Sequence, residues 1–368
     1  MAKLRKYNEH SLCLSLFFMN TKKRILIAPL NWGLGHATRC IPIIHALLKN
    51  NFEVVLASDG VALMLLKKEF PTLEAIELPS YNIEYAKNAK LFKWKLLKDT
   101  PKVLKAIKAE KKALKTIIET HNITGVISDN RLGLHSKKVP CVFISHQLQV
   151  LSGSTTWLST KMHQKIMKQF DVCWVPDNLG TPNLSGKLGH IDISELPIHY
   201  LGPLSRFCKK ETKITTDLLV LLSGPEPQRT LLENKLFEEL KAFKGKIVFV
   251  KGVMEETQTK AQEGNWTIYN FMTSALLEQA INESALVLSR SGYTTIMDLA
   301  KLEKKAFFIP TPGQFEQEYL AKRLDSLGIV PYCKQEDFTI EKLQAATLST
   351  GLTHFDYEIN YKKLFGLF

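Results

Sequence analysis

Two glycines and a histidine follow a short apolar run near the start of the chain. Residues 24–29 have the length and the β-branched content of a strand covered on both faces, and Gly33, Gly35 and His36 come soon after them. Glycine accepts backbone angles that a side chain would forbid, and apolar residues then recur at helical spacing. A strand, a glycine turn and a helix in this order can aim main-chain N–H groups at an anion such as a phosphate.

This turn does not match the familiar phosphate signatures. Thr38 stands where the fingerprint G-x-G-x-x-G has its third glycine, and no G-x-x-x-x-G-K-[ST] P-loop is present. The residues alone therefore leave two interpretations of the turn, a phosphate site or a plain tight connection between a strand and a helix. His36 also has two, a catalytic residue or a structural hydrogen-bonding group.

A second strand, turn and helix carries hydroxyl groups and a carboxylate. Residues 286–288 predict a strand, and Ser291 and Gly292 lie in the turn before a helix that begins near Tyr293. Asp298 follows within that helix, where a carboxylate can accept hydrogen bonds from the vicinal hydroxyls of a ribose. The loop PTPGQFEQ (310–317) comes after a further strand and presents amide and carboxylate side chains, namely Gln314, Glu316 and Gln317.

The elements around these turns alternate between strands and helices. Because repeated βα units build a parallel sheet covered by helices, the sequence predicts two α/β domains joined by the proline-containing linker 197–217. Ligands bind at the carboxyl ends of such strands, so we expect the functional site in a cleft between the domains. The expected strands are 24–29, 52–58, 73–78, 125–128, 141–145, 172–175, 217–222, 246–251, 266–269, 286–288 and 306–309. The expected helices are 37–49, 60–69, 101–120, 228–243, 274–282, 293–302 and 316–326.

Composition limits the class of protein and of partner. The 368 residues include 45% hydrophobic and 23% charged residues, and a net charge of +13 favours an anionic partner such as a nucleic acid, a phosphorylated small molecule or a membrane surface. The six cysteines lack the spacing of a zinc site, so we predict no metal site and no disulfide frame. Residues 1–18 imitate a signal peptide without its cleavage site, and we expect residues 1–19 to be an extension outside the fold.

One lysine-rich segment departs from the alternating pattern. Residues 87–115 interleave lysines with aromatic and aliphatic residues, and Thr100 with Pro101 predicts a division into two helices. A basic helix with apolar residues on its other side can lie on an anionic membrane surface, where each lysine contributes about 1 kcal/mol. The alternative is a solvated lysine face on an ordinary surface helix.

The run SRSG followed by a carboxylate, a strand ending in proline and a glutamine-containing loop resembles the nucleotide-binding half of GT-B glycosyltransferases. The GLGH turn resembles the glycine-rich loop of the branch that contains the peptidoglycan N-acetylglucosaminyltransferase and monogalactosyldiacylglycerol synthase. The resemblance spans about residues 23–365 and implies two Rossmann-like, doubly wound domains that face a central cleft. It implies an acceptor-binding domain over 20–200, a nucleotide-sugar-binding domain over 201–350, and a C-terminal helix within 351–368 that packs back on the first domain.

The same resemblance assigns roles to individual residues. Ser291, Gly292 and the following helix would hold the diphosphate, Asp298 the ribose, and Gln317 the donor sugar. Glu318 stands where relatives often have a second glutamine, which leaves the sugar open. The implied nucleotide-sugar-binding residues are Gly33, Gly35, Arg206, Ser223, Gly224, Phe271, Met272, Ser291, Gly292, Thr294, Asp298, Gln314 and Gln317. The implied acceptor-binding residues are Asn130, His146 and Gln147.

The resemblance also implies the reaction. A hexose or N-acetylhexosamine would move from a UDP-sugar, with inversion, to a lipid-linked or glycan acceptor of the cell envelope, and no cofactor beyond the donor would be needed. Main-chain N–H groups can stabilise the leaving diphosphate, and no convincing D-x-D pair is present, so we expect metal-independent chemistry. His36 is the expected base or positioning residue, with Asp129 and His146 as rival bases. The expected location is the cytoplasm, on the inner face of the membrane.

Three other classes of protein remain to be weighed. A UDP-sugar 2-epimerase or hydrolase would use the same two domains without an acceptor, whereas segment 87–115 favours a second, bulky substrate. A nucleic-acid-binding protein would explain the charge, but the chain has no zinc-finger spacing and no RNP-like aromatic motif. A nicotinamide oxidoreductase is disfavoured because the third fingerprint glycine is missing.

Overall fold

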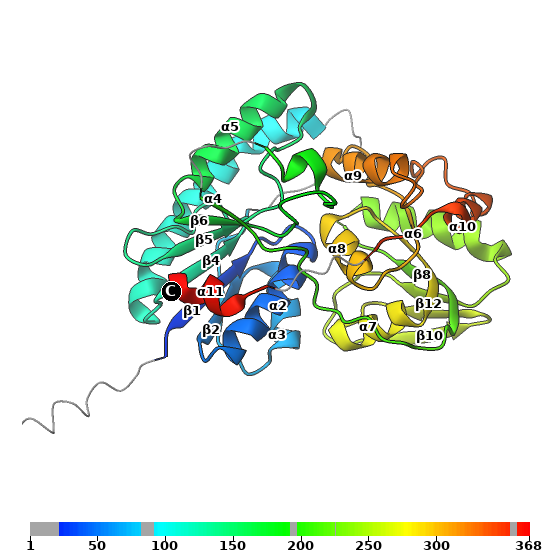
Figure 1. Cartoon of the computed structure of the whole chain (residues 1–368), viewed down its shortest axis with the longest axis horizontal. Coiled ribbons are helices and arrows are strands. Elements are labelled where there is room, and N and C mark those ends of the chain that lie inside the picture. The colour runs from blue at the N-terminus through cyan, green and yellow to red at the C-terminus, as the bar shows by residue number, and fades with distance from the viewer. Residues whose placement is uncertain (1–21, 82–91, 192–196, 225, 354–358) are drawn as a thin grey trace, which may run out of the picture.

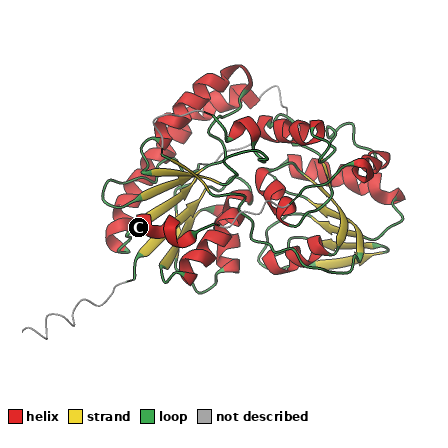
Figure 2. Cartoon of the chain, in the orientation of Figure 1, coloured by secondary structure: helices red, strands yellow, loops and turns green. Residues whose placement is uncertain are grey.

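The protein is seen in a computed structural model that describes residues 22–81, 92–191, 197–224, 226–353 and 359–368. These residues form two lobes, each built on one sheet with helices on both faces (Figures 1 and 2). The expected extension 1–19 and residues 87–91 of the lysine-rich segment lie outside the described residues.

The N-terminal lobe is a seven-stranded parallel sheet in the order β3-β2-β1-β4-β5-β6-β7. Its strands are β1 (Arg24–Pro29), β2 (Glu53–Ser58), β3 (Ala75–Glu77), β4 (Gly125–Asp129), β5 (Cys141–Ile144), β6 (Val172–Val175) and β7 (Ile198–Tyr200). Its helices are α2 (Gly35–Lys49), α3 (Gly60–Glu69), α4 (Phe92–Thr120) and α5 (Thr156–Met167). The chain leaves the centre of the sheet in opposite directions from β1 and β4, and ligands bind at such a reversal in α/β sheets.

The C-terminal lobe repeats this plan with six strands in the order β10-β11-β9-β8-β12-β13. Its strands are β8 (Thr216–Leu221), β9 (Ile247–Val250), β10 (Lys260–Glu263), β11 (Trp266–Tyr269), β12 (Ser284–Ser289) and β13 (Ala306–Phe308). Its helices are α6 (Gln228–Glu239), α7 (Ser274–Asn282), α8 (Tyr293–Lys301), α9 (Phe315–Ser326) and α10 (Ala345–Leu348). Only β10 among these strands runs antiparallel to its neighbour. In this sheet the chain leaves in opposite directions from β8 and β12, so the corresponding ligand-binding position lies between these two strands.

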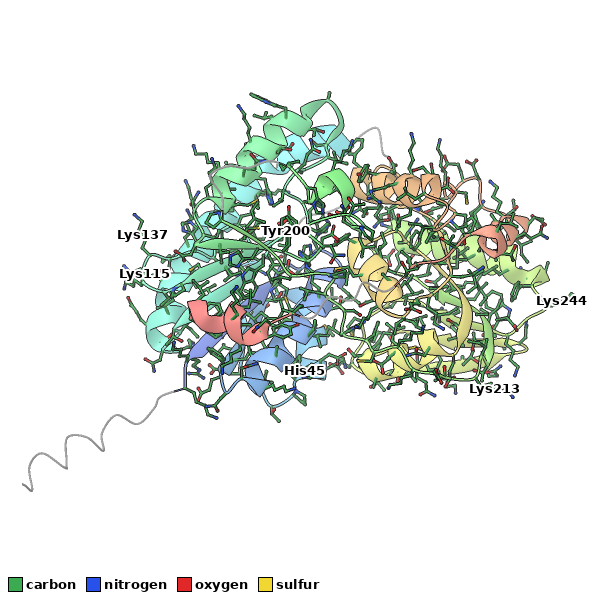
Figure 3. The ribbon with its side chains drawn as sticks, viewed as in Figure 1. His45, Lys115, Lys137, Tyr200, Lys213 and Lys244 are labelled. Atoms are coloured by element: carbon green, nitrogen blue, oxygen red, sulfur yellow. The ribbon has the colours of Figure 1, made fainter. Side chains whose placement is uncertain are left out.

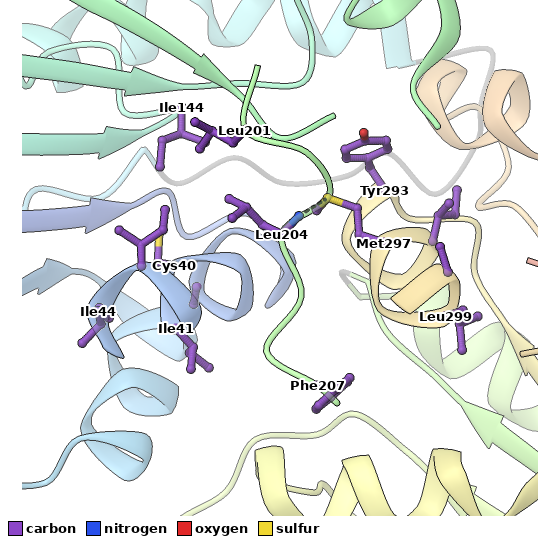
Figure 4. Close-up of a cluster of buried hydrophobic side chains, with 14 of the residues drawn as sticks. Cys40, Ile41, Ile44, Ile144, Leu201, Leu204, Phe207, Tyr293, Met297 and Leu299 are labelled. Carbon is purple, nitrogen blue, oxygen red and sulfur yellow. Dashed lines mark hydrogen bonds between the residues drawn. The ribbon is translucent and has the colours of Figure 1, made fainter. Parts of the chain in front are cut away.

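One hydrophobic cluster joins the two lobes. It contains Ile41 of α2 and Met297 of α8, and Leu204 from the segment between the lobes packs between these helices (Figure 4). The Leu204 N–H also donates to the Met297 sulfur at 3.3 Å. Because this core is continuous, α2 and α8 are held against each other. Their N-termini therefore lie close together, at the carboxyl ends of the strands of both sheets.

The last residues of the chain return to the N-terminal lobe. Helix α11 (Tyr361–Leu364) lies beside β1 and β2 in Figure 1, and the Phe365 ring contacts Phe52 and Trp174. Phe368 packs on β4, where an added Cβ at Gly125 would come within 2.3 Å of its ring. A glycine at this position of β4 therefore makes room for the terminal aromatic residue.

The structure corrects the expected division of the lysine-rich segment. Pro101 lies inside the continuous helix α4 and does not begin a second helix. A proline removes one helical hydrogen bond, but the lysines, leucines and alanines around it have high helix propensity and carry the helix through.

Four of these helices and strands were not expected from the sequence, and one of them is the short helix α10. Helix α5 lies in a stretch rich in serine and threonine, and the antiparallel strand β10 consists of four exposed residues without an apolar pattern. Strand β7 lies in the expected linker. No helix in the described part of the chain is long and apolar enough to cross a membrane.

Candidate active site

A cavity of about 430 Å³ lies between the lobes, at the carboxyl ends of the strands of both sheets. It brings together most of the residues singled out in the sequence. These are Gly33, Gly35, His36, Asn130, His146, Gln147, Arg206, Ser223, Gly224, Phe271, Met272, Gly292, Thr294, Asp298, Gln314 and Gln317. The glycine turn of the first lobe and the SRSG turn of the second thus face the same space.

Two helix N-termini meet in this cavity. The Thr294 hydroxyl in the first turn of α8 donates to the Gly35 carbonyl at 3.0 Å, and a Cβ on Gly35 would lie 3.1 Å from that hydroxyl oxygen. Neither helix has a side-chain cap or an acidic residue in its first turn. The N–H groups and the positive dipole ends of both helices are therefore available to an anion.

His36 and Asp129 form a buried pair beside the glycine turn. His36 Nδ1 lies 2.8 Å from Asp129 Oδ1, and Arg39 binds both oxygens of the same carboxylate, with its Nε 2.5 Å from Oδ2. Burial by itself would raise the pKa of Asp129, but the charge of Arg39 and the contacts with His36 outweigh burial and lower this pKa to about 2. Asp129 is fully buried and does not line the cavity, so it supports His36 from behind.

His36 is neutral at physiological pH. Burial and then the charge of Arg39, whose Nη2 lies 2.7 Å from Nδ1, lower the pKa of His36 below its ordinary value, although Asp129 opposes them. The Asp129 carboxylate favours a proton on Nδ1, whereas the Arg39 N–H that faces the same nitrogen favours a lone pair there. His36 thus has Nδ1 between two buried charged partners, and the residue also lines the cavity.

His146 has no comparable free nitrogen. Arg39 Nη1 donates to His146 Nδ1 at 3.1 Å, which places the ring proton on Nε2, and this N–H donates to Glu316 of the other lobe at 2.9 Å. The second Glu316 oxygen accepts from Gln147, and the Tyr293 ring stacks on the imidazole at 4.2 Å. Asp129 is sealed from the cavity and both ring nitrogens of His146 are engaged, whereas His36 lines the cavity.

Arg206 and Asp298 both line the cavity and influence each other's charge. Burial lowers the pKa of Arg206, although Asp298 and Glu69 oppose this shift, and its buried Nε and Nη1 find no hydrogen-bond partner among the described residues. Burial raises the pKa of Asp298 to about 6, against the charge of Arg206 and a hydrogen bond of 2.6 Å from Ser205. A guanidinium with unused donors thus stands beside a carboxyl group that titrates near neutrality.

In the loop at Phe271 and Met272, which is expected to bind the nucleotide base, some main-chain groups already form hydrogen bonds within the protein. The Phe271 N–H donates to Asn270 at 2.9 Å, and the Phe271 carbonyl accepts from Gln258 at 2.7 Å. Among the described residues, the main chain of Met272 has no hydrogen-bond partner of this kind. Base recognition by main-chain groups would therefore depend on Met272 more than on Phe271.

Ser291 and Asp129 are the two predicted residues that do not line the cavity. The Ser291 hydroxyl is buried and donates to the Gln317 carbonyl at 2.8 Å, so its side chain supports the first turn of α9 and does not line the cavity. The Gln317 side-chain oxygen in turn accepts from Thr311 N–H at 2.8 Å. Only the Gln317 amide nitrogen remains to contact a ligand.

Sequence reasoning missed Arg39 and Tyr293 and gave Glu316 no role. Arg39 lies three residues after His36, so a helix places both on one face, and this spacing was a usable signal. The ring stack of Tyr293 on His146 and the bond of Glu316 to His146 join the two lobes. These contacts join residues that are far apart in the sequence, so no local sequence pattern predicts them.

The Arg39–Asp129 pair predicts a specific stability effect. Arg39→Met should lower the free energy of unfolding by about 3 kcal/mol or more, because it leaves a buried carboxylate without its main cation. The double variant Arg39→Met, Asp129→Leu should recover part of the loss. Arg24→Met is the control, because the ion pairs of Arg24 with Glu53 and Glu74 are partly exposed and contribute about 1 kcal/mol or less. Thermal unfolding checks this ranking, and an Arg39→Met protein as stable as the control contradicts it.

Comparison with known proteins agrees with this geometry. The family description "Glycosyltransferase family 28 C-terminal domain" matches residues 228–356. A relative from Haemophilus ducreyi is 25% identical over 66% of this chain and 70% of its own length, and one from Pasteurella multocida is 23% identical over 92% of this chain and 90% of its own. Both are named UDP-N-acetylglucosamine--N-acetylmuramyl-(pentapeptide) pyrophosphoryl-undecaprenol N-acetylglucosamine transferase.

Solved structures share the whole architecture. The glycosyltransferase SnogD from Streptomyces nogalater has a TM-score of 0.58 at 13% identity, with 95% of this chain and all of that chain covered. MurG from Acinetobacter baumannii has a TM-score of 0.51 at 16% identity, with 89% of this chain and 92% of that chain covered. At these identities the likeness concerns the fold, and it confirms the expected α/β architecture. The chain has the fold of the GT-B glycosyltransferases, and its residues 228–356 match the glycosyltransferase family 28 C-terminal domain.

Proposed function

We propose that the enzyme transfers a sugar from a UDP-sugar to a hydroxyl group of a lipid-linked acceptor, with inversion and without a metal ion. The observation that carries this proposal is the convergence of three groups on the cavity that His36 lines: two uncapped helix N-termini, and the Arg206 guanidinium, whose Nε and Nη1 have no hydrogen-bond partner among the described residues. Relatives named for UDP-N-acetylglucosamine and pyrophosphoryl-undecaprenol make these the first donor and acceptor classes to test.

The donor site follows from the groups that face the cavity. The diphosphate lies between the first turns of α2 and α8, where main-chain N–H groups and Arg206 bind it. Asp298 accepts hydrogen bonds from the ribose, and the main chain of Met272 meets the base. Gln314 and Gln317 face the sugar, and Asn130 lies on the acceptor side with its buried Oδ1 unpaired among the described residues.

The reaction is a single displacement. His36 Nε2 removes the proton of the acceptor hydroxyl as its oxygen bonds to the anomeric carbon, and the bond from that carbon to the diphosphate breaks on the opposite side. The electron pair leaves with UDP, whose growing charge the helix N-termini and Arg206 already face. Asp129 holds the ring of His36 and stabilises the imidazolium that forms.

Replacing the proposed base tests this mechanism. His36→Ala should lower kcat by about 100-fold or more, because general-base catalysis contributes at least that much, while UDP binding changes little. His199→Ala is the matched control, since His199 is exposed on β7. Release of UDP in the presence of a lipid-linked acceptor measures kcat. A folded His36→Ala enzyme with the turnover of the control would rule out this role.

Incubation without an acceptor separates transfer from the rival chemistry. A transferase leaves the UDP-sugar largely intact until an acceptor hydroxyl is supplied, whereas a 2-epimerase or hydrolase converts the sugar of the donor alone. Binding of UDP-sugars, seen as a rise in the unfolding temperature, also separates this class from proteins that bind NAD or nucleic acid.

Donor affinity should depend on pH through Asp298. Its pKa of about 6 means that the carboxylate gains a proton as the pH falls through 6, and a protonated carboxyl group accepts the ribose hydrogen bonds less well. We expect a UDP-sugar to bind about tenfold more weakly at pH 5 than at pH 7.5. Asp298→Asn should bind weakly at both values. Calorimetric titration measures this, and an equal pH dependence in the wild type and in Asp298→Asn would contradict the assignment.

A membrane surface is the proposed source of the acceptor. The described part of α4 exposes lysines at 102, 105, 108, 111, 112 and 115, and Lys115 projects from the outer side of the lobe in Figure 3. Helix α5 exposes Trp157, Leu158 and Met162 by 68%, 52% and 50%, while Ser159 of the same helix lines the cavity. Apolar side chains near lysines and beside the cavity fit an anionic lipid surface.

Vesicle binding tests this surface. The triple variant Trp157→Ser, Leu158→Ser, Met162→Ser should lose most of its sedimentation with vesicles that contain anionic lipid, because it removes the side chains that would enter the headgroup region. Leu348→Ser is the control, since Leu348 is 90% exposed in the C-terminal lobe. A triple variant that sediments like the control would show that α5 does not contact lipid.

A further inference from the structure

Helix α7 of the C-terminal lobe is capped by a residue of the N-terminal lobe. Glu69 is the last residue of α3, and its Oε1 accepts from the Ser274 N–H at 2.8 Å and from the Ser274 hydroxyl at 2.7 Å. The N-cap residue of α7, Thr273, makes no side-chain capping bond. The carboxylate therefore satisfies a first-turn N–H of α7 and faces the positive end of its dipole.

The same end of α3 reaches the loop that precedes α7. Lys68 Nζ bonds to the carbonyl of Glu256 and lies 5.3 Å from the centre of the Phe271 ring. Phe271 and Met272 line the cavity just before Ser274. Lys68 thus contacts Phe271, on which base recognition is proposed, and Glu69 contacts Ser274, which follows shortly after it.

These contacts lie at the edge of the cavity. Leu65, one turn before Glu69 on α3, and Leu277, one turn into α7, both line it. The charge of Glu69 also favours the charged form of Arg206, the guanidinium that faces the cavity. One carboxylate therefore acts on the base-reading loop and on the proposed phosphate-binding arginine.

All of these contacts join different lobes, so they exist only when the lobes are as close as they are here. A ligand that binds across both lobes favours the same closed arrangement, and whatever stabilises that arrangement strengthens its binding. The coupling is reciprocal, because a nucleotide that orders the loop at Met272 also places Ser274 for Glu69.

We propose that Glu69 is a positioning residue that couples closure of the two lobes to binding of the nucleotide. This inference rests on the proposed function for the identity of the nucleotide as UDP. Glu69 touches no substrate and acts through Ser274 and the loop at Phe271–Met272. Its loss should therefore weaken donor binding while the chemical step is kept.

Substitutions on both sides of the contact test the proposal. Glu69→Ala should raise the Kd for UDP and the donor KM about threefold to tenfold, with kcat and the acceptor KM nearly unchanged. Ser274→Ala should have a smaller effect in the same direction, and the double variant should bind UDP no worse than Glu69→Ala, because the two residues share one interaction. Glu69→Gln keeps an acceptor oxygen and should recover part of the loss. Glu119→Ala is the matched control, since Glu119 pairs with Lys138 inside the same lobe.

A distance measurement between spin labels on the two lobes gives a second readout that needs no ligand. In the absence of UDP, Glu69→Ala should shift the distribution to longer distances than the control shows. If the wild type binds UDP and Glu69→Ala matches the control in Kd and in distance, the coupling is overturned. If the wild type binds no UDP, the proposed function fails and the assignment of the nucleotide fails with it, while the distance shift still decides whether Glu69 holds the lobes together.

Discussion

Two helix N-termini are held within hydrogen-bond distance of each other across the two lobes, and the site depends on this approach. Gly35 permits it, because a side chain there would press against Thr294. The continuous core of α2, α8 and Leu204 keeps the two helices in place. The positive N-terminal ends of α2 and α8, which belong to different lobes, can therefore act on one ligand. This arrangement suits a diphosphate, which carries charge on both phosphates.

Next to the two helix N-termini, buried charged residues determine which side chain can accept a proton. Arg39 fixes Asp129 as a carboxylate and occupies one nitrogen of His146, whose other nitrogen is bound to Glu316. The same guanidinium contributes to keeping His36 neutral. Catalytic assignment, stability and contact between the lobes therefore depend on one arginine, so a change at Arg39 is expected to affect all three.

The sequence predicted the parts of the fold that local patterns encode. Apolar runs marked β1, β6 and β11 with their observed bounds, and the two glycine turns were placed at the strand ends that form the cavity. Helix α5 was not predicted because its serines and threonines obscure the apolar period, and it is held by contacts with distant residues. The break at Pro101 was wrong because propensity over the whole helix outweighed one missing hydrogen bond.

The same distinction between local patterns and long-range contacts applies to the residues of the candidate site. The sequence singled out His36 beside a glycine turn and Asp298 in the helix that follows the SRSG turn, and both residues line the cavity. Arg39, Tyr293 and the bond between Glu316 and His146 were not singled out, because their roles come from packing between the lobes. The resemblance placed Ser291 at the phosphates, whereas its hydroxyl bonds to the first turn of α9, a distinction that only coordinates make.

A crystal structure of the chain with UDP bound tests the central claim most directly. The account predicts phosphate oxygens within hydrogen-bond distance of main-chain N–H groups in the first turn of α8, next to Gly35, with Arg206 Nε or Nη1 bound to the nucleotide. A diphosphate bound elsewhere, with both helix N-termini left to solvent, would contradict it.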